Sequence, residues 1–137
     1  MEKIMIATNS LLASKPLRQI KAIRIGLDAR EIEKLVVHFK LHPVELASML
    51  GLSIGSLRYR VRQGLRLDSV ASERLLRLAR VANHAATIFG DSISAGDWLL
   101  RPHSMLDNAT PLSMLDTAYG AQEVERILYS IEHGLPV

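Results

Sequence analysis

The chain of 137 residues contains no cysteine. Without thiols it cannot form disulfides, thiolate zinc fingers, iron–sulfur clusters or a catalytic thiolate. Disulfides are rare in a reducing cytoplasm, so a chain that cannot form them fits the cytoplasmic location that we expect.

Aromatic residues, glycine and proline are also scarce: six residues are aromatic, and glycine and proline together number 13. A β-sandwich or β-barrel normally uses more of all three. Leu, Ala, Arg and Glu dominate the composition, and these residues favour helices. Because 48% of the residues are apolar, the chain can bury a core. We therefore predict an all-α fold.

Long apolar runs are missing as well. None approaches the roughly 20 residues that span a bilayer. Residues 1–14 include Glu2 and lack the apolar stretch of a secretory signal. We expect no membrane partner.

Charge is distributed unevenly along the chain. Residues 1–70 contain 12 Lys and Arg against 6 Asp and Glu, whereas residues 71–137 contain 5 against 8. A polyanion would attract the first half and not the second. This asymmetry favours nucleic-acid binding by the N-terminal half, although small basic domains are common.

Apolar residues spaced three and four apart predict a series of helices. Asp28-x-x-Glu31 resembles a capping box, Ser53 and Asp68 suit N-caps, and Gly120 separates the last two expected helices. The predicted helices cover residues 17–26, 28–39, 43–50, 53–63, 68–89, 92–100, 110–119 and 121–131. We expect residues 1–16 to form a tail, residues 17–66 an N-terminal domain and residues 67–137 a C-terminal domain.

Residues 43–62 match a helix-turn-helix position by position. Small Ala47 stands four residues before Gly51, where two crossing helices approach closely and the chain turns. The core positions of the unit are apolar: Leu46, Leu50, Leu52 and Leu57. The alternative is a helical hairpin with a purely structural role.

The second helix of this unit carries the candidate base contacts. Arg58, Tyr59 and Arg62 share a helical face with Ser53 and Gly55, and no acidic residue lies among them. In a major groove, arginine pairs bidentately with guanine. We therefore expect these five residues to face the bases.

The remaining DNA-binding candidates are Ser56, Arg60 and Arg66. Arg60 and Arg66 lie further round the helix and suit phosphate contacts, which fix the register without reading sequence. A solvated basic face is the alternative, but like charges at this density repel one another unless a polyanion is bound.

Two further patterns suggest chemistry that the chain cannot support. Residues 51–55 match Gly-x-Ser-x-Gly, yet a nucleophile elbow needs a preceding strand and a large sheet, so Ser53 is predicted to be a helix cap. His38 and His42 have metal-ligand spacing, but Pro43 interrupts the helix and no third ligand is near. No phosphate-binding glycine loop occurs. We expect no catalysis, no metal and no cofactor.

The second half carries a series of ordered motifs. They are residues 72–81 (SERLLRLARV), Phe89-Gly90-Asp91, Ala95-x-x-Trp98-Leu99, Thr110-Pro111-Leu112, Thr117-x-x-Gly120 and Ile131-Glu132-His133-Gly134. This string, behind a helix-turn-helix, resembles the Xre/MbcA/ParS-type antitoxins that are encoded beside RES-domain toxins. One departure is Asp107-Asn108-Ala109, where relatives often carry glycines.

The resemblance covers about residues 17–134 and implies a division of labour. An N-terminal domain would bind operator DNA, and a C-terminal domain would dimerise and bind the toxin. RES toxins consume NAD, so the antitoxin would act by blocking that active site and by repressing its own operon. A free-standing repressor without a toxin partner is the alternative.

Candidate toxin contacts lie at helix ends and bends, which can enter an enzyme cleft. They are Asp97, Arg101, Asp116, Glu132, His133 and Val137. Trp98 is interpreted first as a core residue and second as an interface residue. Arg74, Arg77 and Arg80 recur on one face of the long helix, either solvated or paired with acids of a partner.

Overall fold

A computed structural model describes residues 8–136, and within this range the chain is helical without a β-strand. The elements are α2 (Pro16–Ile25), α3 (Arg30–Phe39), α4 (Pro43–Leu50), α5 (Ile54–Gln63), α6 (Ser69–Phe89), α7 (Ser92–Leu99), η1 (Ser104–Leu106), η2 (Leu112–Asp116) and α8 (Ala118–Glu132). η1 and η2 are 3₁₀ helices. The all-α prediction is confirmed, with most helix bounds within two residues of those expected.

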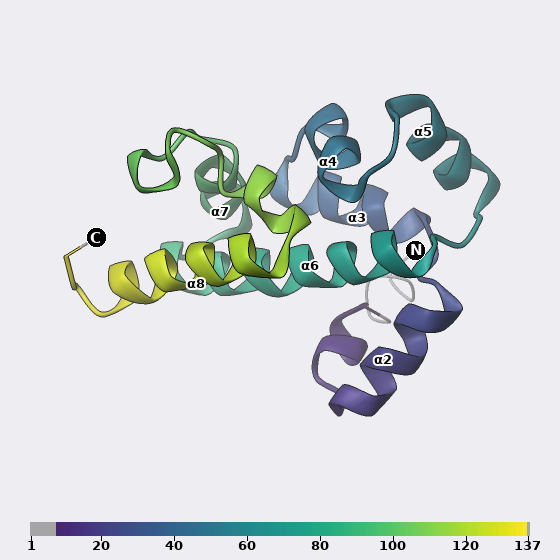
Figure 1. The fold of residues 1–137 in the computed structure, drawn as a ribbon, viewed down its shortest axis with the longest axis horizontal. Coiled ribbons are helices and arrows are strands. Elements are labelled where there is room, and N and C mark those ends of the chain that lie inside the picture. Colours follow the sequence, from purple (N-terminus) through teal and green to yellow (C-terminus); the bar gives the residue numbers. More distant parts are fainter. Residues whose placement is uncertain (1–7, 137) are drawn as a thin grey trace.

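The long helix α6 organises the molecule. It contacts α2, α3, α4, α7, α8 and η2. In Figure 1, α8 runs alongside α6, while α5 and the C-terminal end of α8 lie toward opposite ends of the long axis. One apolar core includes Ile32 and Leu46 from the N-terminal half and Leu99 and Ile127 from the C-terminal half, all fully buried. The two halves therefore share a core.

Predicted N-caps begin the central helices. The Ser53 hydroxyl accepts a hydrogen bond from the Ser56 N–H at 3.1 Å, and the Asp68 carboxylate accepts one from the Ala71 N–H at 2.8 Å. Asp91 caps α7 in the same way, with a distance of 2.6 Å to the Ser94 nitrogen. Each bond satisfies a backbone donor that the first helical turn leaves free.

The capping box expected at Asp28-x-x-Glu31 is not formed. The Asp28 carboxylate accepts from the Arg30 N–H at 2.9 Å, two residues on, whereas a capping box needs the N–H three residues on. Ala29 is the N-cap of α3 and has no side-chain cap bond. Glu31 is buried at 4% exposure and does not reach back to the helix start. Among residues 8–136, neither of its carboxylate oxygens has a hydrogen-bond partner within 3.5 Å. Tertiary packing overrides the local motif here.

Gly120 does not separate two helices, which corrects the sequence prediction. It lies inside the first turn of α8, where Thr117 is the N-cap. A Cβ atom at Gly120 would collide with the Met114 carbonyl oxygen of η2. The glycine therefore permits close approach of two backbones and does not end a helix.

The described part of the N-terminal segment contains a helical turn at residues 8–12. Thr8 and Leu11 are buried. The Gln19 side chain donates to the Leu11 carbonyl at 3.1 Å. Residues 1–16 show no sustained apolar period, so the sequence does not indicate this turn.

Candidate functional site

The α4–α5 pair has the packing that the helix-turn-helix pattern predicts. Leu46, Ala47, Leu50 and Leu57 are each at most 4% exposed. Gly51 has a φ of 79°, a left-handed conformation that reverses the chain between the two helices. The Leu52 N–H donates to the Ala47 carbonyl at 2.9 Å and closes the turn.

Helix α5 presents a basic surface to solvent. Leu57 is its only buried residue, while Ser53, Gly55, Arg58, Tyr59 and Arg62 are exposed. The Arg62 guanidinium carbon lies 6.0 Å from the centre of the Tyr59 ring, a cation–π contact. The structure thus brings the five predicted base-contact residues onto one exposed face.

The other three DNA-binding candidates make contacts within the chain. Ser56 is half-buried, and its hydroxyl accepts from Arg60 Nε at 3.2 Å. Arg60 Nη1 also donates to the Arg66 carbonyl at 3.3 Å. Arg66 lies beyond the end of α5, and its Nη1 donates to the Gly26 carbonyl at 3.0 Å. These arginines are anchored beside the exposed face of α5.

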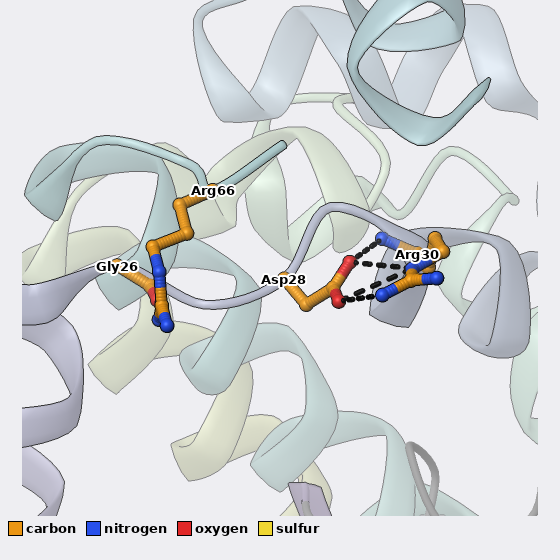
Figure 2. A network of polar contacts seen from close by, with 4 residues as sticks. All are labelled: Gly26, Asp28, Arg30 and Arg66. Carbon is orange, nitrogen blue, oxygen red and sulfur yellow. Dashed lines mark hydrogen bonds and ion pairs between the residues drawn. The ribbon is translucent and has the colours of Figure 1, made fainter. Parts of the chain in front are cut away.

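Figure 2 shows polar contacts between the segment before α3, with Gly26 and Asp28, and the residues around it, Arg30 and Arg66. Asp28 and Arg30 form an ion pair at 2.6 Å, and the hydrogen bond from the Arg30 side chain holds the pKa of Asp28 below its usual value. The Arg66 side chain extends to Gly26 instead. Backbone bonds from Ala29 to Leu65 at 2.9 Å and from Leu67 to Leu27 at 2.8 Å join the two segments.

Arg30 is a positive residue that the sequence pattern does not single out. It lines a groove of about 640 Å³ between α3 and α5, together with Arg58 and Arg62. Arg30 belongs to a different helix from the predicted basic face. Only the packing of α3 against α5 brings the three arginines together, so no spacing in the sequence could identify it.

The candidate toxin contacts lie on three different elements. Asp97 and Arg101 form an ion pair with 2.8 Å between Oδ2 and Nη2 at the end of α7. Asp116 is exposed at the end of η2, where it lines a groove of about 330 Å³ with Glu45 of α4. Glu132 and His133 lie at the end of α8, and Val137 lies outside the described residues.

His84 of α6 binds both carboxylates on the flank of α8. Its Nδ1 lies 2.6 Å from Glu125 Oε2, and its Nε2 lies 3.3 Å from Glu132 Oε1. Burial acts to lower the pKa of His84, but the hydrogen bonds to Glu125 and Glu132 outweigh it, so the pKa lies above 6.5. A protonated imidazolium donates from both nitrogens, which ties α8 to α6.

The three arginines on one face of α6 donate hydrogen bonds to other elements of the same chain. Arg74 Nη1 donates to the Met49 carbonyl at 3.3 Å, and Arg77 Nη1 donates to the Leu115 carbonyl at 2.7 Å. Arg80 donates to Gln19 Oε1 at 3.2 Å. Within the chain, the elements that face these arginines present carbonyl and amide oxygens, and Arg80 is also exposed to solvent.

Trp98 packs against the core as the first interpretation expects. It is half-buried, with its ring centroid 5.7 Å from that of Phe89.

Features of other protein classes were sought in residues 8–136. Within that range no three His, Asp or Glu side chains are grouped to hold a metal. His42 Nδ1 lies 3.1 Å from Glu45 Oε2, its neighbour on the next turn. No helix in the described part of the chain is long and apolar enough to cross a membrane.

Comparison with known proteins matches both halves. Residues 18–80 match the antitoxin Xre-like helix-turn-helix domain, and residues 84–134 match the antitoxin Xre/MbcA/ParS C-terminal toxin-binding domain. The fold and its exposed α5 therefore define a DNA-binding helix-turn-helix protein that also carries a toxin-binding domain. More particularly, the chain belongs to the Xre family of type II antitoxins.

Individual relatives align over most of the chain. An Antitoxin Xre of Photorhabdus laumondii is 32% identical over 111 residues, which cover 80% of this chain and 75% of that protein. An Antitoxin Xre of Pseudomonas putida is 32% identical over 109 residues, covering 80% and 67% respectively. A Prs ADP-ribosylating antitoxin of a Sphingobium species is 23% identical over 137 residues, covering 93% and 86%.

Proposed function

We propose that this antitoxin neutralises an NAD-consuming RES-domain toxin by direct binding and represses its own operon through α5. One observation carries the proposal: a basic, exposed helix-turn-helix face and a toxin-binding domain are joined by one helix, α6. The Sphingobium relative is named an ADP-ribosylating antitoxin, and ADP-ribosylation draws on NAD. This name supports a toxin whose chemistry uses NAD.

On DNA, we propose two sets of contacts. Arg58, Tyr59 and Arg62, with Ser53 and Gly55, face the bases, and their shared exposure on α5 supports this role. The phosphate contacts come from Arg60 on the flank of α5 and from Arg66 beyond its end, and Ser56 is a further DNA-binding residue. Binding as a homodimer at inverted repeats would place two copies of α5 in successive major grooves.

Toxin contacts are proposed at Asp97, Arg101, Asp116, Glu132, His133 and Val137. Residues 84–134 contain seven acids against two Lys or Arg, which favours a neutral or basic partner surface. The division at residues 66/67 remains a proposal. Because the two halves share one core, we design its tests on the full chain and not on fragments.

The first prediction separates the two functions. In the full chain, Arg58→Ala combined with Arg62→Ala should weaken promoter binding by about 1–3 kcal/mol per lost base contact and leave inhibition of NAD loss unchanged. Promoter binding is measured by electrophoretic mobility shift at fixed salt, and inhibition with the RES-domain toxin encoded beside this chain. Arg126→Ala on α8 is the matched arginine control for the DNA assay.

Three results would contradict the proposal. Promoter binding at wild-type strength by the double variant would remove α5 from the DNA interface. A chain that binds its promoter but no toxin, with no RES-domain gene beside it, would be a free-standing repressor. Hydrolase activity abolished by Ser53→Ala would indicate an enzyme, although Ser53 is the N-cap of α5.

A further inference from the structure

One face of α8 is directed to solvent and carries two of the three tyrosines of the chain. The opposite face packs into the core through Gly120, Val124, Ile127 and Leu128. Tyr119 is 83% exposed and Tyr129 is 54% exposed. At spacings of three and four, the exposed row is Tyr119, Gln122, Arg126, Tyr129 and His133. We refer to these five residues as the α8 tyrosine face.

Three of the five side chains of this face, those of Arg126, Tyr129 and His133, make contacts within the chain. The rings of Tyr129 and His133 have centroids 4.2 Å apart. Arg126 Nε lies 2.7 Å from Glu123 Oε2. The bonds from His84 to Glu125 and Glu132 hold the helix itself on α6. Such ordering reduces the entropy that a partner must remove on binding.

A groove of about 450 Å³ borders the face between α6 and α8. Val81, Ala118 and Ala121 provide its apolar part, and Gln122 lines the groove while belonging to the face. The charged part of the lining consists of Glu73, Arg77, Arg80 and Glu125. A partner that covers the tyrosines therefore meets a hollow beside them. Exposed aromatic side chains next to a pocket are typical of interface hot spots.

The tyrosine face differs in composition from the rest of its domain, which is rich in acids. Several acids of residues 84–134 are already paired: Asp97 with Arg101, Glu123 with Arg126, and Glu125 and Glu132 with His84. The tyrosine face has no acid among its five residues, although Arg126 pairs with neighbouring Glu123 and His133 lies 3.8 Å from Glu132. Tyrosine and arginine are the residue types that carry most binding energy at protein interfaces.

We propose that the α8 tyrosine face is the surface on which the toxin docks, with Tyr119 and Tyr129 as its two anchors. Because α8 lies within residues 84–134, which match a toxin-binding domain, we assign the face to a toxin. An interface with a second copy of this chain is an outcome that the test below distinguishes. The proposal rests on the proposed function for the identity of that toxin. It adds residues that the helix-end candidates do not include, apart from His133.

The experiment compares full-length variants for affinity to the purified RES-domain toxin encoded beside this chain, by isothermal titration calorimetry. Tyr119→Ala and Tyr129→Ala should each weaken the affinity by about 30-fold or more, the level of an interface hot spot. Tyr119→Phe keeps the ring and should bind within a few-fold of wild type. Tyr59→Ala removes a tyrosine of α5 with 52% exposure and should leave toxin affinity unchanged while weakening promoter binding.

Thermal melts and light scattering accompany each variant. The replaced side chains are exposed, so the melting temperature should stay near that of wild type. If both alanine variants bind the toxin as tightly as the wild type does, the assignment of the tyrosine face is wrong, while the proposed function still holds. Variants that become monomeric yet keep toxin affinity would show an interface between copies and overturn it as well. Failure of the wild-type chain to bind would overturn this assignment and the proposed function together.

Discussion

At the scale of single residues, Glu31 makes the stability of the protein depend on pH. Burial, aided by the negative charge of Asp28, raises the pKa of Glu31 from 4.5 to about 7. The folded state therefore favours the protonated acid. The contribution of Glu31 to the free energy of unfolding is fully present below pH 4.5. It is lost as the pH rises through 7, and the loss amounts to at most about 3 kcal/mol.

Glu31→Gln tests this dependence because glutamine has a similar size and does not ionise. The free energy of unfolding of the variant minus that of wild type should be larger at pH 8 than at pH 5. Urea denaturation at both pH values measures this difference. Glu33→Gln, an exposed acid on the same helix, is the control and should leave the pH dependence intact. Identical pH dependence in the wild type and the Glu31 variant would contradict the assignment.

At the scale of elements, the contact of η2 with α8 depends on the absence of a side chain at Gly120. An added Cβ would collide with the Met114 carbonyl, so Gly120→Ala should destabilise the fold by about 1–3 kcal/mol. Gly55→Ala in α5 is the control, since nothing lies within 4 Å of its added Cβ. That control should be neutral or slightly stabilising, because alanine favours helix more than glycine does.

Urea denaturation at one pH measures both glycine variants. If Gly120→Ala has the same free energy of unfolding as Gly55→Ala, the prediction is wrong, and the η2 backbone moves away from the added Cβ without loss of stability.

At the scale of the whole molecule, the two proposed interfaces lie apart. Figure 1 places α5 toward one end of the long axis and the C-terminal half of α8 toward the other. Toxin and promoter DNA should therefore bind together, so that adding toxin shifts the antitoxin–DNA band to lower mobility. A toxin that releases the DNA instead would show that the two interfaces overlap or are coupled through α6.

The sequence by itself determines the features that depend on neighbouring residues. The Ser53 and Asp68 caps and the Gly51 turn are local, and each occurs where the pattern predicts. The helical periods do so as well, except around Gly120. The basic, acid-free row of α5 is local too, because a helix places residues three and four apart on one face. The family resemblance was equally visible, since it rests on ordered motifs.

Only the tertiary structure decided which polar groups meet across the core. His84 bonds to Glu125 and Glu132 across 41 and 48 residues of sequence, and Arg77 reaches Leu115 across 38. The burial of Glu31, the close approach at Gly120 and the position of Arg30 beside α5 likewise depend on how helices pack. Packing brings together residues that are far apart in sequence. A pattern that extends over one or two helical turns cannot predict these contacts, because the contacting residues lie outside it.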